Sequence, residues 1–254
     1  FPLSASTLVA RMPARACGPW QNGGAVIVLS RHSPYSLAFR LAAEHGAVAG
    51  THIPVVPAPI PEHALAKLHP EERVLALSFD GYRQVQFVGG RLALGAALRD
   101  PSRPRAAVLA DAYGAPVLPD GLTGSVSHKR DLAVAIAAPG RHGLGIDIED
   151  TRRVRPGIAP HVLCADELRS LEDLDEKRLW LELITRFSIK EAVYKAVHRF
   201  VRRHIGFHEV AVWPDEHGHA RVELRFEHCG GFRIDATFTL FAHRVLAVVA
   251  AHQV

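Results

Sequence analysis

The stretch GLGIDIE, from Gly143 to Glu149, constrains the fold more than any other part of the sequence. Strand side chains alternate between two faces, so its leucine and two isoleucines share one face, while two glycines, Asp147 and Glu149 share the other. Two neighbouring acids repel unless a cation lies between them, and strand glycines mark close approach of a ligand or another backbone. We expect a strand with a hard cation at its acids and with phosphates in the room that the glycines leave. The alternative is a solvated edge strand with acidic decoration.

A second stretch, FSIKEAVYK from Phe187 to Lys195, has helical spacing. As a helix it places Lys190, Glu191 and Lys195 on one face, and it repeats apolar residues on the opposite, core-seeking side: Ile189, Val193 and Val197. An exposed Glu–Lys pair, worth about 0.2–0.5 kcal/mol on a surface helix, is the alternative. If Glu191 faces the acidic strand, the three carboxylates form an oxygen-rich Mg²⁺ site with positions left for water and phosphate oxygens.

The composition, with 254 residues, 48% hydrophobic and 22% charged, predicts one large globular domain or two domains of ordinary size. No apolar run is long enough to span a bilayer, so we expect no membrane contact. The three cysteines form no CxxC pair, which disfavours a disulfide framework or zinc ribbon and favours a reducing cytoplasm. A net charge of +4 predicts an anionic partner: a phosphorylated cofactor, an acidic protein or nucleic acid.

The periodicity of the first part of the chain predicts a mixture of helices and strands. Helices are expected at Ser33–His45, at residues 61–77 with a break near Pro70, and from an N-cap at Asp80 to about Arg99. Strands are expected at Ala25–Ser30, Ala106–Asp111, a short run ending at Ser127–His128, and Leu132–Ala138.

After the acidic strand, the pattern predicts a short helix, a long helix and an antiparallel meander. The helices are expected at Asp166–Leu171 and from Asp175 to about Phe200, and the strands at Glu209–Trp213, Ala220–Phe226, Phe232–Phe241 and Val245–Ala251. The sequence FAHRVLAVVAA near the end echoes SHKRDLAVAIAA in the middle, which indicates two related halves. We divide them as residues 1–142 and 143–254, with the active site at their junction.

Two further groups of residues are candidates for ligand contacts. Arg83 and Arg91 lie about two turns apart with Phe87 between them, and the adjacent Gly89 and Gly90 indicate close packing or the approach of a ligand. An ordinary arginine-bearing surface helix is the alternative. Ser127 and His128 are suited to hold phosphate oxygens, and they fit the role of plain turn residues equally well.

GIDIE followed by FSIKEAVYK, with the GxP-to-SVSH segment and RQVQFVGGR before them, resembles the phosphopantetheinyl transferases. The likeness is to the large-type branch, which activates siderophore, surfactin and polyketide synthetases, and it spans roughly Pro61 to Phe207. It implies a pseudo-twofold α+β fold of two similar halves, each with a small antiparallel sheet and a long helix. It further implies that coenzyme A and Mg²⁺, or Mn²⁺ in its place, bind between the halves.

The resemblance also implies roles for individual residues. The metal ligands would be Asp147, Glu149 and Glu191, the contacts to the coenzyme A phosphates Ser127, His128, Lys190 and Lys195, and the contacts to the ribose phosphate and adenine Arg83 and Arg91. Lys195 and His128 would balance charge on the leaving group, and Glu191 would accept a proton directly or through a water. Relatives often carry a basic residue beside the glycine of the GxP turn, where this chain has tyrosine and alanine. That phosphate contact is therefore absent or comes from Lys129 or Arg130.

The implied reaction is transfer of phosphopantetheine from coenzyme A to a serine of an apo acyl or peptidyl carrier protein, in siderophore or polyketide biosynthesis. We expect a cytoplasmic monomer. One alternative is a catalytically inactive relative that binds coenzyme A or the carrier. Another is a nucleic-acid-binding module that uses the short basic clusters Arg152, Arg153, Arg155, Arg202 and Arg203. These clusters lack interleaved aromatic residues for base stacking, which disfavours nucleic acid as a partner.

Overall fold

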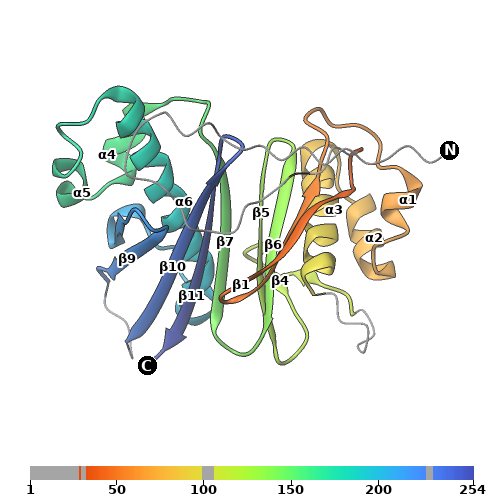
Figure 1. Cartoon of the computed structure of the whole chain (residues 1–254). Helices are drawn as coiled ribbons and strands as arrows, with labels where there is room; N and C mark the ends of the chain where they lie inside the picture. The colour runs from red at the N-terminus through yellow and green to blue at the C-terminus, as the bar shows by residue number, and fades with distance from the viewer. Residues whose placement is uncertain (1–28, 30–32, 99–105, 227–230) are drawn as a thin grey trace.

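A computed structural model describes residue 29 and residues 33–98, 106–226 and 231–254. Two antiparallel sheets lie between two long helices, with α6 (Glu176–Val201) to the left of the strands and α3 (Gly81–Ala97) to the right in Figure 1. This arrangement confirms the predicted α+β class, with a small antiparallel sheet and a long helix in each part of the chain.

The two sheets draw their strands from opposite sides of Gly143. The four-stranded sheet has the order β1 (Leu37–Ala43), β2 (Gly46–His52), β6 (Leu132–Pro139), β5 (Leu122–Lys129). The five-stranded sheet has the order β7 (Gly143–Asp150), β11 (Arg244–Gln253), β10 (Phe232–Phe241), β9 (His219–Leu224), β8 (Val210–Pro214). A division into two domains at this residue stays a prediction.

Shorter elements complete the described chain. These are α1 (Glu62–Leu65), α2 (Pro70–Leu77), α4 (Ala159–Val162), α5 (Ala165–Arg169), the 3₁₀ turns η1 (Pro156–Ile158) and η2 (Phe207–Glu209), and a hairpin of β3 (Leu109–Ala110) with β4 (Pro116–Val117). Within the part of the chain described, no helix combines the length and apolar character needed to cross a membrane.

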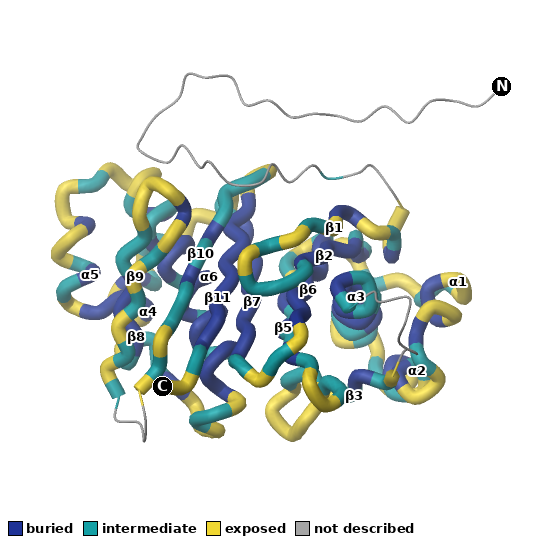
Figure 2. Tube along the Cα trace, turned by 60° about the horizontal axis from the view of Figure 1, so that its bottom comes forward, coloured by how far each residue is buried: buried dark blue, intermediate teal, exposed yellow. Residues whose placement is uncertain are grey.

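The apolar face of the acidic strand forms the contact between the sheets. Leu144, Ile146 and Ile148 of β7 pack against the leucine, valine and isoleucine side chains of β6 and β11, as the alternation predicts. Burying side chains of this size stabilises a fold by about 1.5–3 kcal/mol each. Figure 2 shows β7 and β11 buried along most of their length, so β7 is no solvated edge strand.

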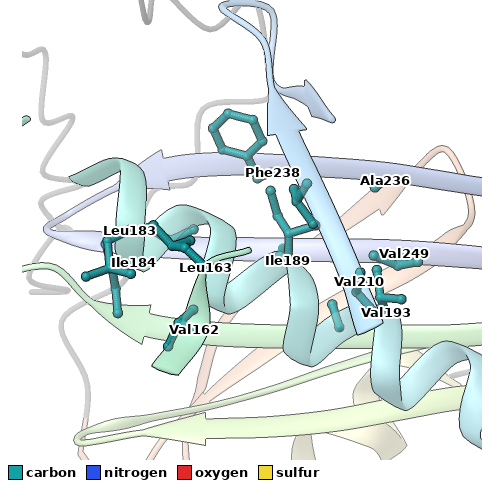
Figure 3. Close-up of a cluster of buried hydrophobic side chains, with 14 of the residues drawn as sticks. Val162, Leu163, Leu183, Ile184, Ile189, Val193, Val210, Ala236, Phe238 and Val249 are labelled. Atoms are coloured by element: carbon teal, nitrogen blue, oxygen red, sulfur yellow. The ribbon is translucent and has the colours of Figure 1, made fainter. Parts of the chain in front are cut away.

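The outer face of the five-stranded sheet is covered by α6. Ile189, Val193 and Val197 of this helix are fully buried, which confirms them as its core-facing side. They pack with residues such as Val249 of β11 and Phe238 of β10 (Figure 3). Asp175 caps the helix through its side chain, which accepts the Arg178 N–H at 2.9 Å.

The glycines of β7 pack against the backbone of α6, so the prediction that they leave room for phosphates is wrong. A Cβ atom at Gly143 or Gly145 would overlap the carbonyl oxygen of Ala196 or Ala192. The helix and strand approach each other closely because no side chain stands between them.

The glycines of α3 also serve close packing, as one of the two interpretations predicted. A Cβ at Gly89 would overlap Ile53, and one at Gly90 would lie 2.8 Å from Cγ1 of Val126. In this contact the glycines belong to the helix and face side chains of the residues against which it packs, whereas in the contact between β7 and α6 the glycines belong to the strand.

The predicted helix at Ser33–His45 is wrong. Residues 37–43 form β1, which pairs with β2 across the turn at Glu44 and His45. Leu37, Phe39 and Leu41 alternate, so this short run fits a strand period as well as a helical one, and the tertiary partner decides. The predicted strand Ala25–Ser30 lies outside the described residues apart from Leu29.

The remaining elements occur where predicted, with shifted ends. Residues 61–77 break before Pro70, as predicted, and the strand expected at Ala106–Asp111 is reduced to β3. Asp80 occupies the N-cap position of α3, but its side chain makes no capping hydrogen bond. The run expected to end at Ser127–His128 continues as β5 to Lys129.

Candidate active site

A cavity of about 800 Å³ lies where the edge strands β5 and β7 come together. Elements from both parts of the chain line it: α3, the β3–β4 turn, β5, β7 and α6. The Ile146 N–H donates to Ser125 Oγ at 3.2 Å, which joins the two edge strands directly. The predicted position of the site, at the junction of the two parts, is therefore occupied by a cavity large enough for a cofactor-sized ligand.

Asp147 is the centre of a hydrogen-bond network beside this cavity. Its carboxylate accepts from Ser127 Oγ at 2.8 Å, from Ser188 Oγ at 3.0 Å and from Lys195 Nζ at 2.7 Å. The residue is only 4% exposed, so these donors replace the water that the carboxylate loses. Asp147 of β7 is thus hydrogen-bonded to both β5 and α6.

Two further acids lie within electrostatic reach of Asp147. Burial raises the pKa of Glu149, and the charge of Asp147 adds to that effect against the hydrogen bond from Lys129. Burial also raises the pKa of Glu191, again with a contribution from Asp147 and against the charge of Lys195. The carboxylates therefore gather in a partly dehydrated place where they lack full charge compensation.

These acids fit a hard divalent cation by chemistry and charge. In this arrangement Lys129 Nζ lies 2.6 Å from Glu149 Oε2, and Lys195 Nζ binds Asp147. Among the residues described, no three histidine, cysteine or carboxylate side chains are arranged as a metal-binding group. The oxygen donors are of the kind that a hard cation prefers, and the two lysines compensate only part of the charge of the three acids.

Lys195 and His128 line the cavity beside the acid cluster. Lys195 Nζ donates to the Ile146 carbonyl at 3.0 Å as well as to Asp147, so the ammonium is held at the cavity wall. His128 is exposed as a whole residue, but protein atoms surround part of its imidazole. This partial burial lowers the pKa of the imidazole, and the positive charge of Lys195 lowers it further. The structure thus brings together Ser127, His128, Lys195 and Asp147, as the sequence predicts.

Arg83 and Arg91 also line the cavity. The guanidinium of Arg83 lies over the Phe79 ring at 4.3 Å. Arg91 is only 5% exposed and donates to the carbonyls of Val108 at 2.6 Å and Leu109 at 3.2 Å. Arg91 therefore ties α3 to the chain that leads into the β3–β4 hairpin and borders the cavity at the same time.

Lys190 does not reach the cavity, which corrects its prediction as a phosphate contact. Its Nζ pairs with Glu167 Oε2 at 2.6 Å and donates to the carbonyls of Val162 at 2.7 Å and Phe207 at 3.1 Å. Consecutive helical residues point about 100° apart, so a lysine next to Glu191 does not share its direction. Lys190 is 2% exposed and holds the segment around α4 and α5 onto α6.

The two residues considered as replacements for the missing basic neighbour of the GxP turn are already paired. Lys129 pairs with Glu149, and Arg130 Nε lies 3.4 Å from Asp150 Oδ2. The proposed nucleic-acid cluster is dispersed in a similar way: Arg152 pairs with Asp150 at 2.7 Å and Arg203 pairs with Glu209 at 2.6 Å.

Sequence analysis missed several cavity residues on the last turns of α6. His198, Arg199 and Arg202 line the cavity together with Tyr194 and Lys195. Their signal was present, because residues three, four and seven positions beyond Lys195 lie on its side of a helix. Tyr113, beside the glycine of the GxP turn, also lines the cavity.

Two sequence models match the chain in succession. One, described as 4'-phosphopantetheinyl transferase N-terminal domain, matches residues 71–138. The other, described as 4'-phosphopantetheinyl transferase superfamily, matches residues 143–249. Together they cover the elements that line the cavity.

Similar proteins bear related names. 4'-Phosphopantetheinyl transferase Svp of Streptomyces mobaraensis is 33% identical over 69% of this chain and 74% of its own length. 4'-Phosphopantetheinyl transferase Npt of Nocardia iowensis is 33% identical over 58% of this chain and 66% of its own. Enterobactin synthase component D of Salmonella typhi is 34% identical over 45% of this chain, and the match spans 48% of that relative.

A solved holo-(acyl-carrier-protein) synthase from Bacillus anthracis, in complex with coenzyme A, is 22% identical over 44% of this chain and 96% of its own, with a TM-score of 0.38. That score is too low to carry residue roles across. The sequence matches are stronger, and they show that the chain belongs to the 4'-phosphopantetheinyl transferase superfamily, in its large-type branch.

Proposed function

We propose that this chain transfers 4'-phosphopantetheine from coenzyme A to a serine of an apo acyl or peptidyl carrier protein. The observation that carries the proposal is the cavity between the two sheets, where Lys195 and His128 stand beside the network around Asp147. The cavity offers positive charge for a phosphorylated ligand and an adjacent acid cluster for proton transfer. The names of the similar transferases and synthases support this choice of reaction.

In the proposed reaction, the carrier serine Oγ attacks the phosphorus on the pantetheine side of the pyrophosphate. The bond between that phosphorus and the bridging oxygen breaks, and adenosine 3',5'-bisphosphate leaves with the electron pair. Lys195 Nζ, fixed by Asp147 and the Ile146 carbonyl, and His128 face the charge that grows on this leaving group. Glu191 accepts the serine proton, directly or through a water, and its raised pKa favours proton uptake.

The anionic substrate would be held by cations from both long helices. Arg83 and Arg91 border the cavity on α3, and Arg199 and Arg202 border it on α6. Arg199 donates to Thr123 Oγ1 at 3.4 Å and to the His142 carbonyl at 3.1 Å, so its position is set by the junction itself. Positioning and charge neutralisation are the main contributions that phosphoryl transfer requires from a protein.

Asp147, Glu149 and Glu191 would hold the metal ion, Mg²⁺ or in its place Mn²⁺. When bound, the ion would neutralise charge on the pyrophosphate. Binding can be tested without any turnover, because a cation that relieves the repulsion among these acids stabilises the folded chain. We expect Mg²⁺ to raise the melting temperature of the wild-type chain and to have a smaller effect on the Asp147→Asn variant.

The proposed partners are carrier domains with a net negative surface, which the charge of +4 on this chain would attract. Siderophore or polyketide biosynthesis in the cytoplasm is the proposed setting, with the chain acting as a monomer because both sides of the cavity come from one polypeptide.

Intact-mass spectrometry of apo carrier proteins tests the reaction directly. The chain is incubated with an acyl or a peptidyl carrier, coenzyme A and Mg²⁺, and we expect a gain of one phosphopantetheine. The gain should disappear with EDTA and when the carrier serine is replaced by alanine. Coenzyme A binding without any gain would identify an inactive binding relative, and absence of both binding and transfer would refute the proposal.

A further inference from the structure

His198, on the cavity side of α6, has two ring nitrogens that make no hydrogen bond within the described residues. The residue is 7% exposed, and both nitrogens are closed off from solvent. Buried polar atoms are nearly always paired, so a histidine that gives up water without gaining a partner requires an explanation. Packing alone would be served better by an apolar ring of similar size.

Two tyrosines hold the imidazole in place. The Tyr194 ring stacks on it at 5.3 Å between ring centroids, and the Tyr113 ring meets it edge-on at 4.7 Å. Tyr194 lies on the same helix, whereas Tyr113 reaches across from the β3–β4 turn. All three rings line the cavity.

Tyr113 covers His198 from an exposed turn. Its side chain belongs to a residue that is 66% exposed, on a turn where Gly114 has a φ of 84°. The turn itself is fixed by Asp111, whose side chain accepts the N–H groups of Tyr113 and Ala115 at 2.9 Å each. The ring can therefore swing away from His198 while the turn keeps its backbone and the core stays packed.

The position of His198 links it to the reacting groups. It lies about one turn beyond Lys195 on α6, and Arg202 follows one turn later. Arg202 also lines the cavity. A ligand that reaches from Lys195 along α6 therefore passes His198 before it meets Arg202.

We propose that His198 is a ligand-binding residue, which hydrogen-bonds a neutral polar group of coenzyme A once Tyr113 has swung aside. A neutral imidazole offers one donor and one acceptor, which matches either the aminopurine of the nucleotide end or an amide of the pantetheine arm. This inference rests on the proposed function, since it assigns a contact to the same substrate. It adds a residue that the sequence analysis did not name as a candidate.

Isothermal titration calorimetry on the full chain tests this contact with three probes: coenzyme A, adenosine 3',5'-bisphosphate and 4'-phosphopantetheine. The variant His198→Phe keeps a ring between the tyrosines and removes both nitrogens. We expect it to weaken binding of coenzyme A by about 2- to 10-fold, the effect of one lost hydrogen bond. His161→Phe, at an exposed position on α4 outside the cavity, is the matched control and should change nothing.

The probes identify the end of the ligand that His198 contacts. Weaker binding of the bisphosphate assigns the contact to the nucleotide end, and weaker binding of phosphopantetheine assigns it to the pantetheine arm. His198→Phe should melt no lower than wild type, because it leaves no unpaired polar atom. Equal affinity of wild type and His198→Phe for all three probes would overturn the inference while leaving the transferase proposal intact. A wild-type chain that binds no coenzyme A would overturn both.

Discussion

Each half of the molecule secures its long helix with a buried acid and a buried cation. In the first half Glu72 stands in the capping box of α2, is 1% exposed and accepts a distant backbone N–H at 3.0 Å. In the second half Glu167 stands in the capping box of α5, is fully buried and also accepts a distant N–H at 3.0 Å. The charge of Glu72 acts on Arg91 of α3, and Glu167 pairs with Lys190 of α6.

The two cations differ in what they can touch. Arg91 lines the cavity, and its planar guanidinium also donates to two carbonyls. Lys190 is sealed among Glu167, two carbonyls and the Cys164 thiol. The buried cation of α6, Lys190, therefore stabilises packing. Two other residues of the same helix, Glu191 and Lys195, lie toward the site.

The two halves also differ in which element carries the glycines at the helix–sheet contact. The first half places them on the helix, at Gly89 and Gly90, and the second half places them on the strand, at Gly143 and Gly145. Because the strand provides the close approach in the second half, α6 keeps a full set of side chains along its length.

The largest expected effect is on proton transfer, which the proposed mechanism assigns to Glu191 of α6. Glu191→Gln should lower the transfer rate by about 10²–10⁴-fold, as for loss of a general base, in an assay of phosphopantetheine gain by intact mass. Glu172→Gln, an exposed acid without a role in the cavity, is the control. Unchanged activity of Glu191→Gln would remove this residue from the mechanism.

The same variant should become more stable at neutral pH. The pKa of Glu191 is raised in the folded state. Its contribution to the free energy of unfolding is therefore fully present below the unfolded-state pKa and is lost as the pH rises through the folded-state pKa. Glutamine does not titrate. Urea titrations at several pH values should therefore show the gain at pH 7 and none in acid.

The buried cations separate stability from ligand binding. Lys190→Met leaves Glu167 as an uncompensated buried charge and should lower the free energy of unfolding by about 3–5 kcal/mol, measured in urea. Coenzyme A affinity of the folded fraction should not change. Arg91→Met should instead weaken coenzyme A binding as well as the fold, because Arg91 also lines the cavity.

A double variant sharpens this test. Adding Glu167→Gln to Lys190→Met removes the stranded charge and should recover part of the lost stability. If the double variant is as unstable as the sum of the two single variants, the pair does not act as a unit. If Lys190→Met lowers coenzyme A affinity, the separation of Lys190 from the cavity is contradicted.

The glycines predict a smaller difference between the halves. Gly145→Ala places a Cβ against the rigid backbone of α6 and should cost about 1–3 kcal/mol in the free energy of unfolding. Gly90→Ala meets only the Val126 methyl at 2.8 Å and gains about 0.8–1 kcal/mol of helix propensity, so its net effect should be close to zero. Equal losses of unfolding free energy at the two positions, measured in urea, would contradict the proposed difference between the two helix–sheet contacts.

Much of this arrangement could be predicted from the sequence because its strongest patterns are local. The alternation in GLGIDIE fixed one buried face of β7, and the spacing in FSIKEAVYK fixed the core side of α6. The acids on the other face had to lie near a charged partner, and they do. These inferences needed only the periods of strands and helices.

The rest depended on tertiary contacts that no local pattern encodes. Lys190 was predicted to contact phosphates, and no local pattern in the sequence indicated its partner Glu167, which lies in another helix. The glycines of β7 pack against the backbone of α6, where a phosphate was expected. A glycine in a strand indicates only that some group approaches closely, and it does not indicate which group. The segment Leu37–Ala43 became a strand because Gly46–His52 was available to pair with it.

The smallest expected effect concerns a histidine cluster at the other end of the junction. His142, in the β6–β7 turn, stacks on His252 of β11 at 5.1 Å, with His45 and Arg199 nearby. Burial and these positive neighbours lower the pKa of His142, while Asp235, 3.8 Å from His252, is the acid that faces the cluster.

Because the pKa of His142 is lowered in the folded chain, its contribution to the free energy of unfolding is present above the unfolded-state pKa of the imidazole. That contribution is lost as the pH falls through the folded-state pKa. His142→Gln should flatten the acid side of the stability curve by at most about 1 kcal/mol, and His161→Gln should leave it unchanged. Parallel curves for wild type and His142→Gln would show that the two halves stay joined regardless of the charge in this turn. A flattened curve would show that their junction weakens in acid at the turn, away from the acids of the site.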